Sequence, residues 1–396
     1  MYLIRLGLRL VLPWLLLAAA GIVAAALPPV YVGLDAELEY ADSTSAQAIR
    51  MGMLIAIEEI NQAGGVLGGR PLALITRDNK GLPARAMENL QELAKKTDLV
   101  AVFGGRFSPT ILEALPLIHA LKLPLLDPWG SADAITSNDY TPNYVFRLSL
   151  RDSWAMPVML RHAGKNRRQR VGLLLVNTSW GRSNLKAAKA YADLHSDIEI
   201  VGTQWFNWAD ISFRDQYTAL KKAGAQAIVF VGNHNEASRM VREMTALPKA
   251  ERLPIVSHWG PSGGHFAEQV GPALHQIDFT LVQTYSFIGA SRPKSGQVLA
   301  AARRQFDVKD ARSMAAPAGV AHAYDLTHIL ARAVDLAGST DRAAVRTALE
   351  QVRDYDGLIK HYPQPFTPAR HEALSQQEVF MARYATDGSM VRVNDR

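Results

Sequence analysis

Residues 56–72 read Ala-Ile-Glu-Glu-Ile-Asn-Gln-Ala-Gly-Gly-Val-Leu-Gly-Gly-Arg-Pro-Leu and lead from a helix through a glycine turn into a strand. Upstream of this stretch, Ile49 and Met53 share one helical face with Ile57. Asn61 and the glycines after it end the helix, as Asn and Gly commonly do. A phosphate-binding loop needs the reverse order, in which glycines follow a strand and precede a helix. The stretch therefore predicts a turn within an alternating chain, without a phosphate site.

The same alternation of apolar strands and periodic helices continues along the chain. The predicted strands are Val30–Leu34, Leu72–Thr76, Leu99–Phe103, Leu123–Leu126, Val145–Leu148, Val171–Val176, Ile198–Val201, Ala227–Val231, Pro254–Ser257 and Phe279–Val282. The helices predicted after the first include Pro109–Ala120, Ser153–His162, Ser183–His195, Phe213–Ala223, Glu236–Thr245, Ala321–Leu336 and Arg342–Val352. This order predicts an α/β fold with parallel sheets. The strands divide near residue 147, so we expect two doubly wound, Rossmann-like lobes with a cleft at their strand ends.

Composition excludes several classes of protein. The chain has 396 residues, 48% of them hydrophobic and 20% charged, which is ordinary for a globular protein. Lys and Arg exceed Asp and Glu by 43 − 37 = 6, too small an excess to indicate nucleic-acid binding. The sequence contains no cysteine, which excludes disulfides, thiolate metal sites and a lipid-modified N-terminal cysteine.

The N-terminus has the three-part pattern of an export signal. Arg5 and Arg9 precede an apolar stretch at 10–26 that ends in small residues, with cleavage expected after Ala26. The alternative is an uncleaved membrane anchor, because the apolar stretch is nearly long enough to span a bilayer. Both readings predict that the remaining chain is exported to the periplasm.

The sequence contains no set of residues with the spacing of a known catalytic motif. We find no Walker motif, no Gly-x-Ser-x-Gly elbow and no His-Glu-x-x-His. The pairs His258 with His265 and His322 with His328 lack an obvious third metal ligand. We therefore predict no enzyme activity, no metal and no cofactor; an α/β hydrolase without a recognisable motif is the rival reading.

Polar and aromatic residues gather directly after the predicted strands. Asp35 and Glu37 follow the first strand, and Phe107 and Ser108 follow the third. At a helix start, the hydroxyl and amide of Ser108 suit a carboxylate; a capped helix that binds nothing is the alternative. Later strand ends carry Asp127, Trp129, Ser131, Trp180, Asn233 and Trp259.

These segments, in this order, resemble the branched-chain amino acid binding proteins of ABC transporters, the leucine/isoleucine/valine type within the type I periplasmic binding proteins. The resemblance runs from about Val30 to the C-terminus and is strongest over 56–72. Further matches are Asp78-Asn79, Phe103-Gly104, Pro124–Pro128 and Phe146-Arg147.

The resemblance implies two lobes that close on a small ligand by hinge motion. The three hinge crossings are expected near 147–151, 279–286 and 356–364. The expected lobes are 30–147 with 284–356 and 148–283 with 357–396. The family delivers its ligand to an ABC permease without catalysis; a membrane-tethered sensor of the same fold is the alternative. We expect a monomer that binds no nucleic acid.

Site residues follow from the resemblance position by position. Ser108 stands where the family holds the ligand carboxylate, and Ser131 stands where a Thr does similar work. Trp180 occupies an aromatic position that closes over the ligand, and Asn233 replaces another aromatic residue there. Trp259 falls near the place where a Glu normally pairs with the α-ammonium.

The Trp259 departure puts an ordinary amino acid ligand in doubt, because a buried ammonium needs an acidic or carbonyl partner. Either Asp35, Glu37 or Asp127 supplies that charge, or the ligand is not an ordinary α-amino acid. The tryptophans at this end of the lobes could instead stack on an aromatic acid or enclose a quaternary ammonium. They are Trp129, Trp180 and Trp259.

Overall fold

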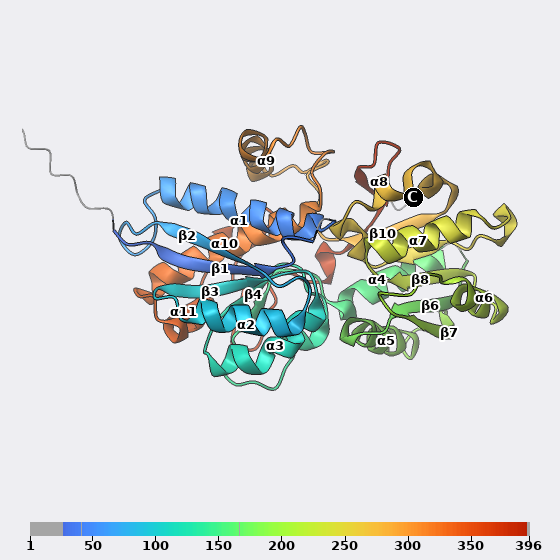
Figure 1. The fold of residues 1–396 in the computed structure, drawn as a ribbon, viewed down its shortest axis with the longest axis horizontal. Coiled ribbons are helices and arrows are strands. Elements are labelled where there is room, and N and C mark those ends of the chain that lie inside the picture. The colour runs from blue at the N-terminus through green and yellow to red at the C-terminus, as the bar shows by residue number, and fades with distance from the viewer. Residues whose placement is uncertain (1–26, 41, 166, 394–396) are drawn as a thin grey trace, which may run out of the picture.

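A computed structural model describes residues 27–40, 42–165 and 167–393. The predicted leader, residues 1–26, lies outside the described residues. Two separate sheets lie side by side along the long axis of the molecule (Figure 1). Parallel pairs dominate both sheets, and helices alternate with their strands, which confirms the predicted α/β, doubly wound class.

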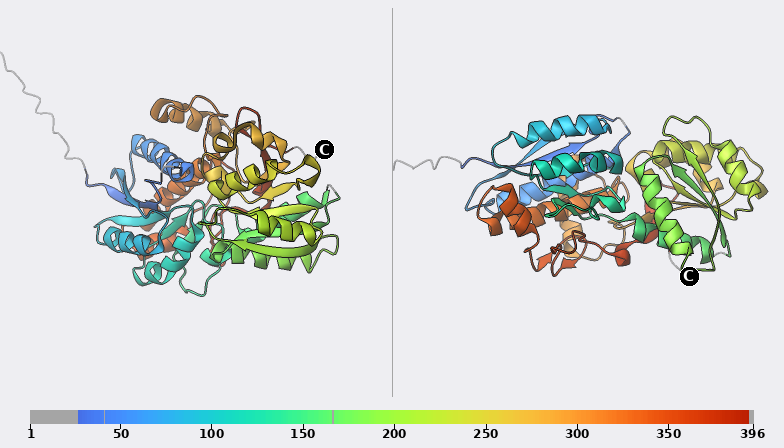
Figure 2. Two further views of the ribbon diagram at one scale, coloured as in Figure 1. Left: turned by 45° about the vertical axis from the view of Figure 1, so that its right-hand side comes forward. Right: turned by 90° about the horizontal axis from the view of Figure 1, so that it is seen from below.

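The first sheet is wholly parallel, with the strand order β2-β1-β3-β4-β5. Helices cover both of its faces (Figure 2). One hydrophobic cluster joins the sheet to α1 and α10, and a second joins it to α2 and α3. The strands are β1 (Val30–Ala36), β2 (Leu72–Asp78), β3 (Leu99–Gly104), β4 (Leu125–Asp127) and β5 (Val145–Arg147). The helices are α1 (Thr44–Gln62), α2 (Pro83–Ala94), α3 (Ser108–Ala120), α9 (Pro293–Phe306), α10 (Pro317–Ala337) and α11 (Arg342–Leu349).

The second sheet has the strand order β14-β13-β10-β9-β8-β6-β7. The β10–β13 and β13–β14 pairs are antiparallel, and the other pairs are parallel. Its strands are β6 (Arg170–Val176), β7 (Glu199–Phe206), β8 (Ala227–Val231), β9 (Ile255–Ser257), β10 (Phe279–Gln283), β13 (Phe380–Tyr384) and β14 (Met390–Arg392). Its helices are α4 (Asp152–Lys165), α5 (Ser179–Ala192), α6 (Arg214–Lys222), α7 (His234–Thr245) and α8 (Phe266–Val270). Among the described residues, no helix is both long and apolar enough to cross a membrane.

The stretch over residues 56–72 forms the predicted helix, turn and strand. Helix α1 starts at a cap in which Ser43 Oγ accepts a hydrogen bond from the Ala46 amide. The turn after α1 needs glycine, because Gly65 has a φ of +73° and a Cβ there would lie 2.3 Å from the Arg70 carbonyl oxygen. Val66 and Arg70 then form a bridge that directs the chain into β2.

A short hairpin near the C-terminus shows where the chain last passes between the sheets. Strands β11 (Tyr355–Asp356) and β12 (His361–Tyr362) pair with each other. Asp325 on α10 accepts hydrogen bonds from both tyrosine hydroxyls of the hairpin and from the Leu358 and Ile359 amides. This hairpin therefore stays with α10. The third passage between the sheets lies between the end of β12 at Tyr362 and the start of β13 at Phe380. The expected crossing near 356–364 and the lobe boundaries stay predictions.

Other differences lie in short or amphipathic elements. The pattern missed α9 and the strands β11 to β14. Helix α5 begins at Ser179, earlier than the predicted Ser183, so Trp180 lies in its first turn. Helix α3 begins at Ser108 itself, with Phe107 as its N-cap.

Candidate functional site

The expected site residues all come from the carboxyl ends of strands or the segments just after them. Asp35 and Glu37 lie at the end of β1, and Phe107 and Ser108 follow β3. Trp129 and Ser131 follow β4, whereas Trp180, Asn233 and Trp259 follow β6, β8 and β9 of the second sheet. The topology thus brings all nine residues toward the region between the sheets. Ligands of parallel α/β folds bind at this place, beyond the carboxyl ends of the strands.

Ser108 makes its hydrogen bonds within the first lobe. Its Oγ accepts from the backbone amides of Ser131, at 3.1 Å, and Ala132, at 3.2 Å. Both serines are buried. In this structure the hydroxyl holds the loop after β4, and its role toward a ligand carboxylate stays a prediction.

The three tryptophans pack into the protein. Trp129 and Trp259 come from opposite sheets, and their ring centroids lie 4.9 Å apart. Both are almost fully buried. Trp180 donates its indole N–H to Asp152, which also lies 3.1 Å from His258 Nε2. These rings therefore fill the deep part of the interlobe region.

The acidic candidates also have partners inside the protein. Asp35 accepts from Asn79 and Asn89, at 2.9 and 2.7 Å, and burial raises its pKa to about 7. Glu37 accepts from the hydroxyls of Ser43 and Ser45.

Asp127 is likewise engaged by backbone groups. Its Oδ1 accepts from the Trp129 and Gly130 amides, at 3.0 and 2.6 Å. Burial raises its pKa to about 7, with the nearby charge of Arg147 opposing the shift. Asp35 and Glu37 would have to give up or share their hydrogen bonds to bind an ammonium. The Oδ2 atom of Asp127 has no hydrogen-bond partner among the described residues, but it is buried.

Arg106 is the side chain that links the two lobes at the centre of the site. It follows β3, and its Nη1 donates to the carbonyl of Gly263 in the second lobe at 2.8 Å. Its Nε lies 3.6 Å from Glu37 Oε1 as a buried ion pair, and its Nη1 lies 3.5 Å from His234 Nδ1. Burial lowers the pKa of His234 to about 3, and the charge of Arg106 adds to this, so the imidazole is neutral.

An interlobe cavity of about 670 Å³ opens beside Arg106. Of the nine expected residues, Phe107 and Asn233 line it. The ring centroids of Phe107 and Trp208 lie 5.4 Å apart, and the two residues belong to opposite lobes. The other lining residues include Tyr40, Lys80, Leu82, Arg106, His234, Glu236, Arg239, Arg242, Glu243 and Gln269.

Sequence reasoning missed Arg106, His234 and Trp208. Arg106 and His234 stand within strand-end segments, at Gly104-Gly105-Arg106 and Asn233-His234-Asn235, so their position was available as a signal. Trp208 follows a strand that extends to Phe206, beyond the predicted end at Val201.

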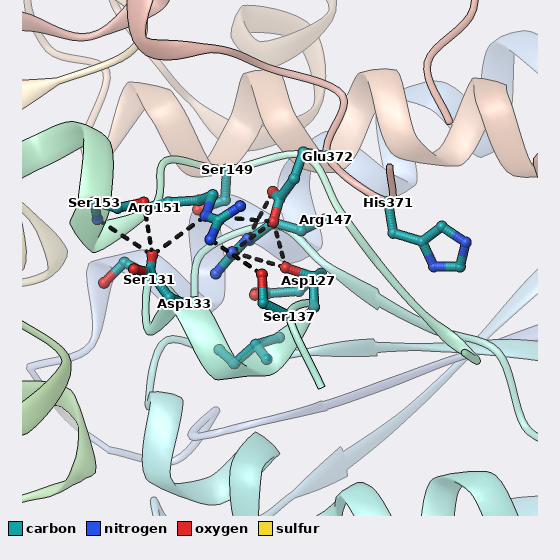
Figure 3. Close-up of polar contacts among 12 residues, drawn as sticks. Asp127, Ser131, Asp133, Ser137, Arg147, Ser149, Arg151, Ser153, His371 and Glu372 are labelled. Carbon is teal, nitrogen blue, oxygen red and sulfur yellow. Dashed lines mark hydrogen bonds and ion pairs between the residues drawn. The ribbon is translucent and has the colours of Figure 1, made fainter. Parts of the chain in front are cut away.

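The first and last crossings between the lobes are joined by a buried ion pair (Figure 3). Arg147 donates from Nε and Nη2 to the two carboxylate oxygens of Glu372, at 2.9 and 2.7 Å. Backbone bonds run from the Arg147 amide to the His371 carbonyl and from the Ala373 amide to the Arg147 carbonyl. Arg151 links Glu372 to Asp133 in the same network. The hinge strands are thus tied to each other directly.

The described residues contain no group of three His, Asp or Glu side chains that could hold a metal ion.

A family model of periplasmic binding proteins matches residues 29–389, which is most of the chain. The chain belongs to the periplasmic binding protein family. This result agrees with the resemblance stated above and with the two lobes around a cleft.

Individual relatives of this periplasmic binding protein agree with the family assignment. The Leu/Ile/Val-binding protein homolog 3 of Brucella melitensis is 24% identical over 359 residues, covering 86% of this chain and 89% of the relative. A type 1 periplasmic binding protein from Bordetella pertussis has a TM-score of 0.82 at 21% identity, covering 92% of this chain and all of that structure. A branched-chain amino acid transporter substrate-binding protein from Streptococcus pneumoniae, solved with isoleucine, has a TM-score of 0.75 at 21% identity over 92% and 100% of the chains.

Proposed function

We propose that this periplasmic binding protein captures a small organic ligand between its lobes and delivers it to an ABC importer. The ligand is an amino acid, an aromatic acid or a related amine or carboxylate. The interlobe cavity beside Arg106 carries this proposal, because it is lined from both lobes and has a volume suited to a small molecule. Ligand contacts to both lobes favour the closed arrangement over the open one.

Thermal unfolding with a compound library tests the proposal. A ligand that binds the folded state should raise the melting temperature, because binding stabilises by RT ln(1 + [L]/Kd), about 2.7 kcal/mol at a hundredfold excess over Kd. We expect a shift with one chemical class among amino acids, organic acids and amines. A melting temperature that stays constant across all three classes would contradict ligand capture.

The tethered sensor differs from the importer component by its N-terminus. For the importer component we propose that the leader is removed after Ala26 and that the protein acts as a monomer without enzymatic turnover. Intact-mass measurement of the exported protein separates the two functions, because retention of residues 1–26 would favour a tethered sensor.

A further inference from the structure

We propose that the ligand of this protein binds at the Arg106–His234 end of the interlobe cavity and is an organic acid with an apolar body and no ammonium group. This inference rests on the proposed function: it names the chemical class of the ligand that the protein captures between its lobes and the part of the cavity in which that ligand binds. It differs from the resemblance, which places the ligand carboxylate at Ser108.

The deep part of the interlobe region is occupied by the protein itself. The Ser108 hydroxyl accepts two backbone amides, and Trp129 packs on Trp259 from the opposite lobe. Trp180 is held by Asp152. The cavity that both lobes line instead includes Arg106 and His234, whereas Ser108 and these three tryptophans are not part of its lining.

Two buried donors at the inner end of this cavity lack an acceptor. Arg106 is 6% exposed and His234 is fully buried, and both line the cavity. Within the described residues, neither Arg106 Nε nor His234 Nε2 has a hydrogen-bond partner. The nearest carboxylate oxygen to Arg106 Nε, from Glu37, lies 3.6 Å away, which is an ion-pair distance and too long for a hydrogen bond. His234 Nδ1 faces the Arg106 guanidinium, so Nδ1 is the acceptor and the ring proton lies on Nε2. Buried donors of this kind call for a ligand acceptor, and a carboxylate offers two oxygens.

The charge of the lining favours an anion. Lys80, Arg239 and Arg242 add three cations to Arg106. The lining contains two acids, and each already accepts a backbone amide: Glu236 from Asn233, and Glu243 from Phe213. With Glu37, the ion-pair partner of Arg106, four cations face three acids, so the lining keeps a net positive charge. That charge attracts a carboxylate and repels an α-ammonium.

Exposed apolar side chains form the outer part of the same cavity. Tyr40, Leu82 and Trp208 are 44%, 56% and 37% exposed, respectively, and all three line the cavity. Phe107 faces Trp208 from the other lobe at a ring-centroid distance of 5.4 Å. Large apolar side chains gathered at a concave surface mark a binding site, and aromatic rings offer flat faces to a ligand. The apolar body of the acid therefore lies among these residues while its carboxylate points toward Arg106.

Matched ligand pairs test the chemical class by titration calorimetry. The probes are 3-phenylpropanoate and L-phenylalanine, which differ by the ammonium group, with 4-methylpentanoate and L-leucine as the second pair and 2-phenylethylamine as the cation. We expect at least one acid to bind about tenfold or more tightly than its amino acid and the amine not to bind. Amino acids that bind as tightly as the acids would overturn the inference and leave ligand capture intact. Failure of both acids to bind overturns the inference, and only failure of the whole compound library overturns capture.

Variants of exposed residues test the location. Trp208→Ala and the double variant Lys80→Ala/Arg242→Ala should each weaken binding of the acid about tenfold, because they remove an aromatic wall or two cations. Arg304→Ala is the matched control, since Arg304 is exposed on α9 and pairs with Glu58 outside the cavity. Arg106→Gln should abolish binding; if that variant does not fold, the exposed variants decide. An affinity that stays unchanged in both exposed variants would place the ligand elsewhere.

Discussion

Replacing Glu372 by alanine should lower the free energy of unfolding by about 3–5 kcal/mol, because it leaves the buried charge of Arg147 without its partner. Arg147 is fully buried, and its side chain donates to both Glu372 oxygens and to the Gly130 and Ala132 carbonyls. Glu372 lies in the last crossing and Arg147 at the start of the first. The variant therefore removes an interaction that stabilises the hinge between the lobes. Urea unfolding followed by circular dichroism measures this effect.

Two further variants separate the charge from the packing in this test. Glu372→Gln keeps most of the side-chain volume and one acceptor, so we expect a smaller loss than for alanine. Glu199→Ala removes an exposed partner of Arg170 and should cost about 0–1 kcal/mol, as surface ion pairs do. Equal losses in Glu372→Ala and Glu199→Ala would refute the buried hinge pair.

Asp127→Asn should reduce the dependence of stability on pH between about pH 4 and pH 7. Burial raises the pKa of the native Asp127 carboxyl from its ordinary value of 3.8 to about 7. The native state therefore keeps a proton that the unfolded state releases near pH 4. The stabilising contribution is complete below pH 4 and is lost as the pH rises through 7. Relative to the natural protein, the variant should gain on the order of 4 kcal/mol between pH 4 and pH 8, at about 1.4 kcal/mol per pKa unit.

The measurement is the free energy of unfolding of both proteins at several pH values, compared as a difference so that other titrating groups cancel. Asp387→Asn is a control of opposite sign. Hydrogen bonds from Ser389 lower the pKa of Asp387 to about 2, so its contribution is lost as the pH falls. A difference between Asp127→Asn and the natural protein that does not change with pH would show that the carboxyl is not protonated in the native state.

The sequence allowed the fold class to be predicted because the strands of a parallel sheet are continuous apolar runs. Leu99–Gly104 and Ala227–Val231 are buried along their whole length, and Val30–Ala36 is buried at every position except Tyr31, so these runs were recognised as strands. Strand β14 escaped prediction because Met390–Arg392 is short and partly exposed. Strand β13 escaped it because only Met381 and Ala382 of its five residues are buried, so no continuous apolar run marks it. The hairpin β11/β12 depends on Asp325, about thirty residues earlier in the chain, and no local pattern reveals such a contact.

The sequence predicted where the candidate site lies better than it predicted which residues line the cavity. Strand ends located Phe107 and Asn233 beside the cavity, since parallel strands bring their ends together. Local sequence did not show that the Trp129 and Trp259 rings meet across the lobes, or that Ser108 holds backbone amides. Those contacts join residues far apart in the chain, and so do the contacts of Arg106 with Glu37 and Gly263.

Native mass spectrometry of the purified protein mixed with a pooled library of amino acids, organic acids and amines tests the central claim most directly. The account predicts a one-to-one complex between the folded monomer and one small organic acid, and loss of that complex in Trp208→Ala. A folded protein that carries no small molecule from any of the three classes would contradict it.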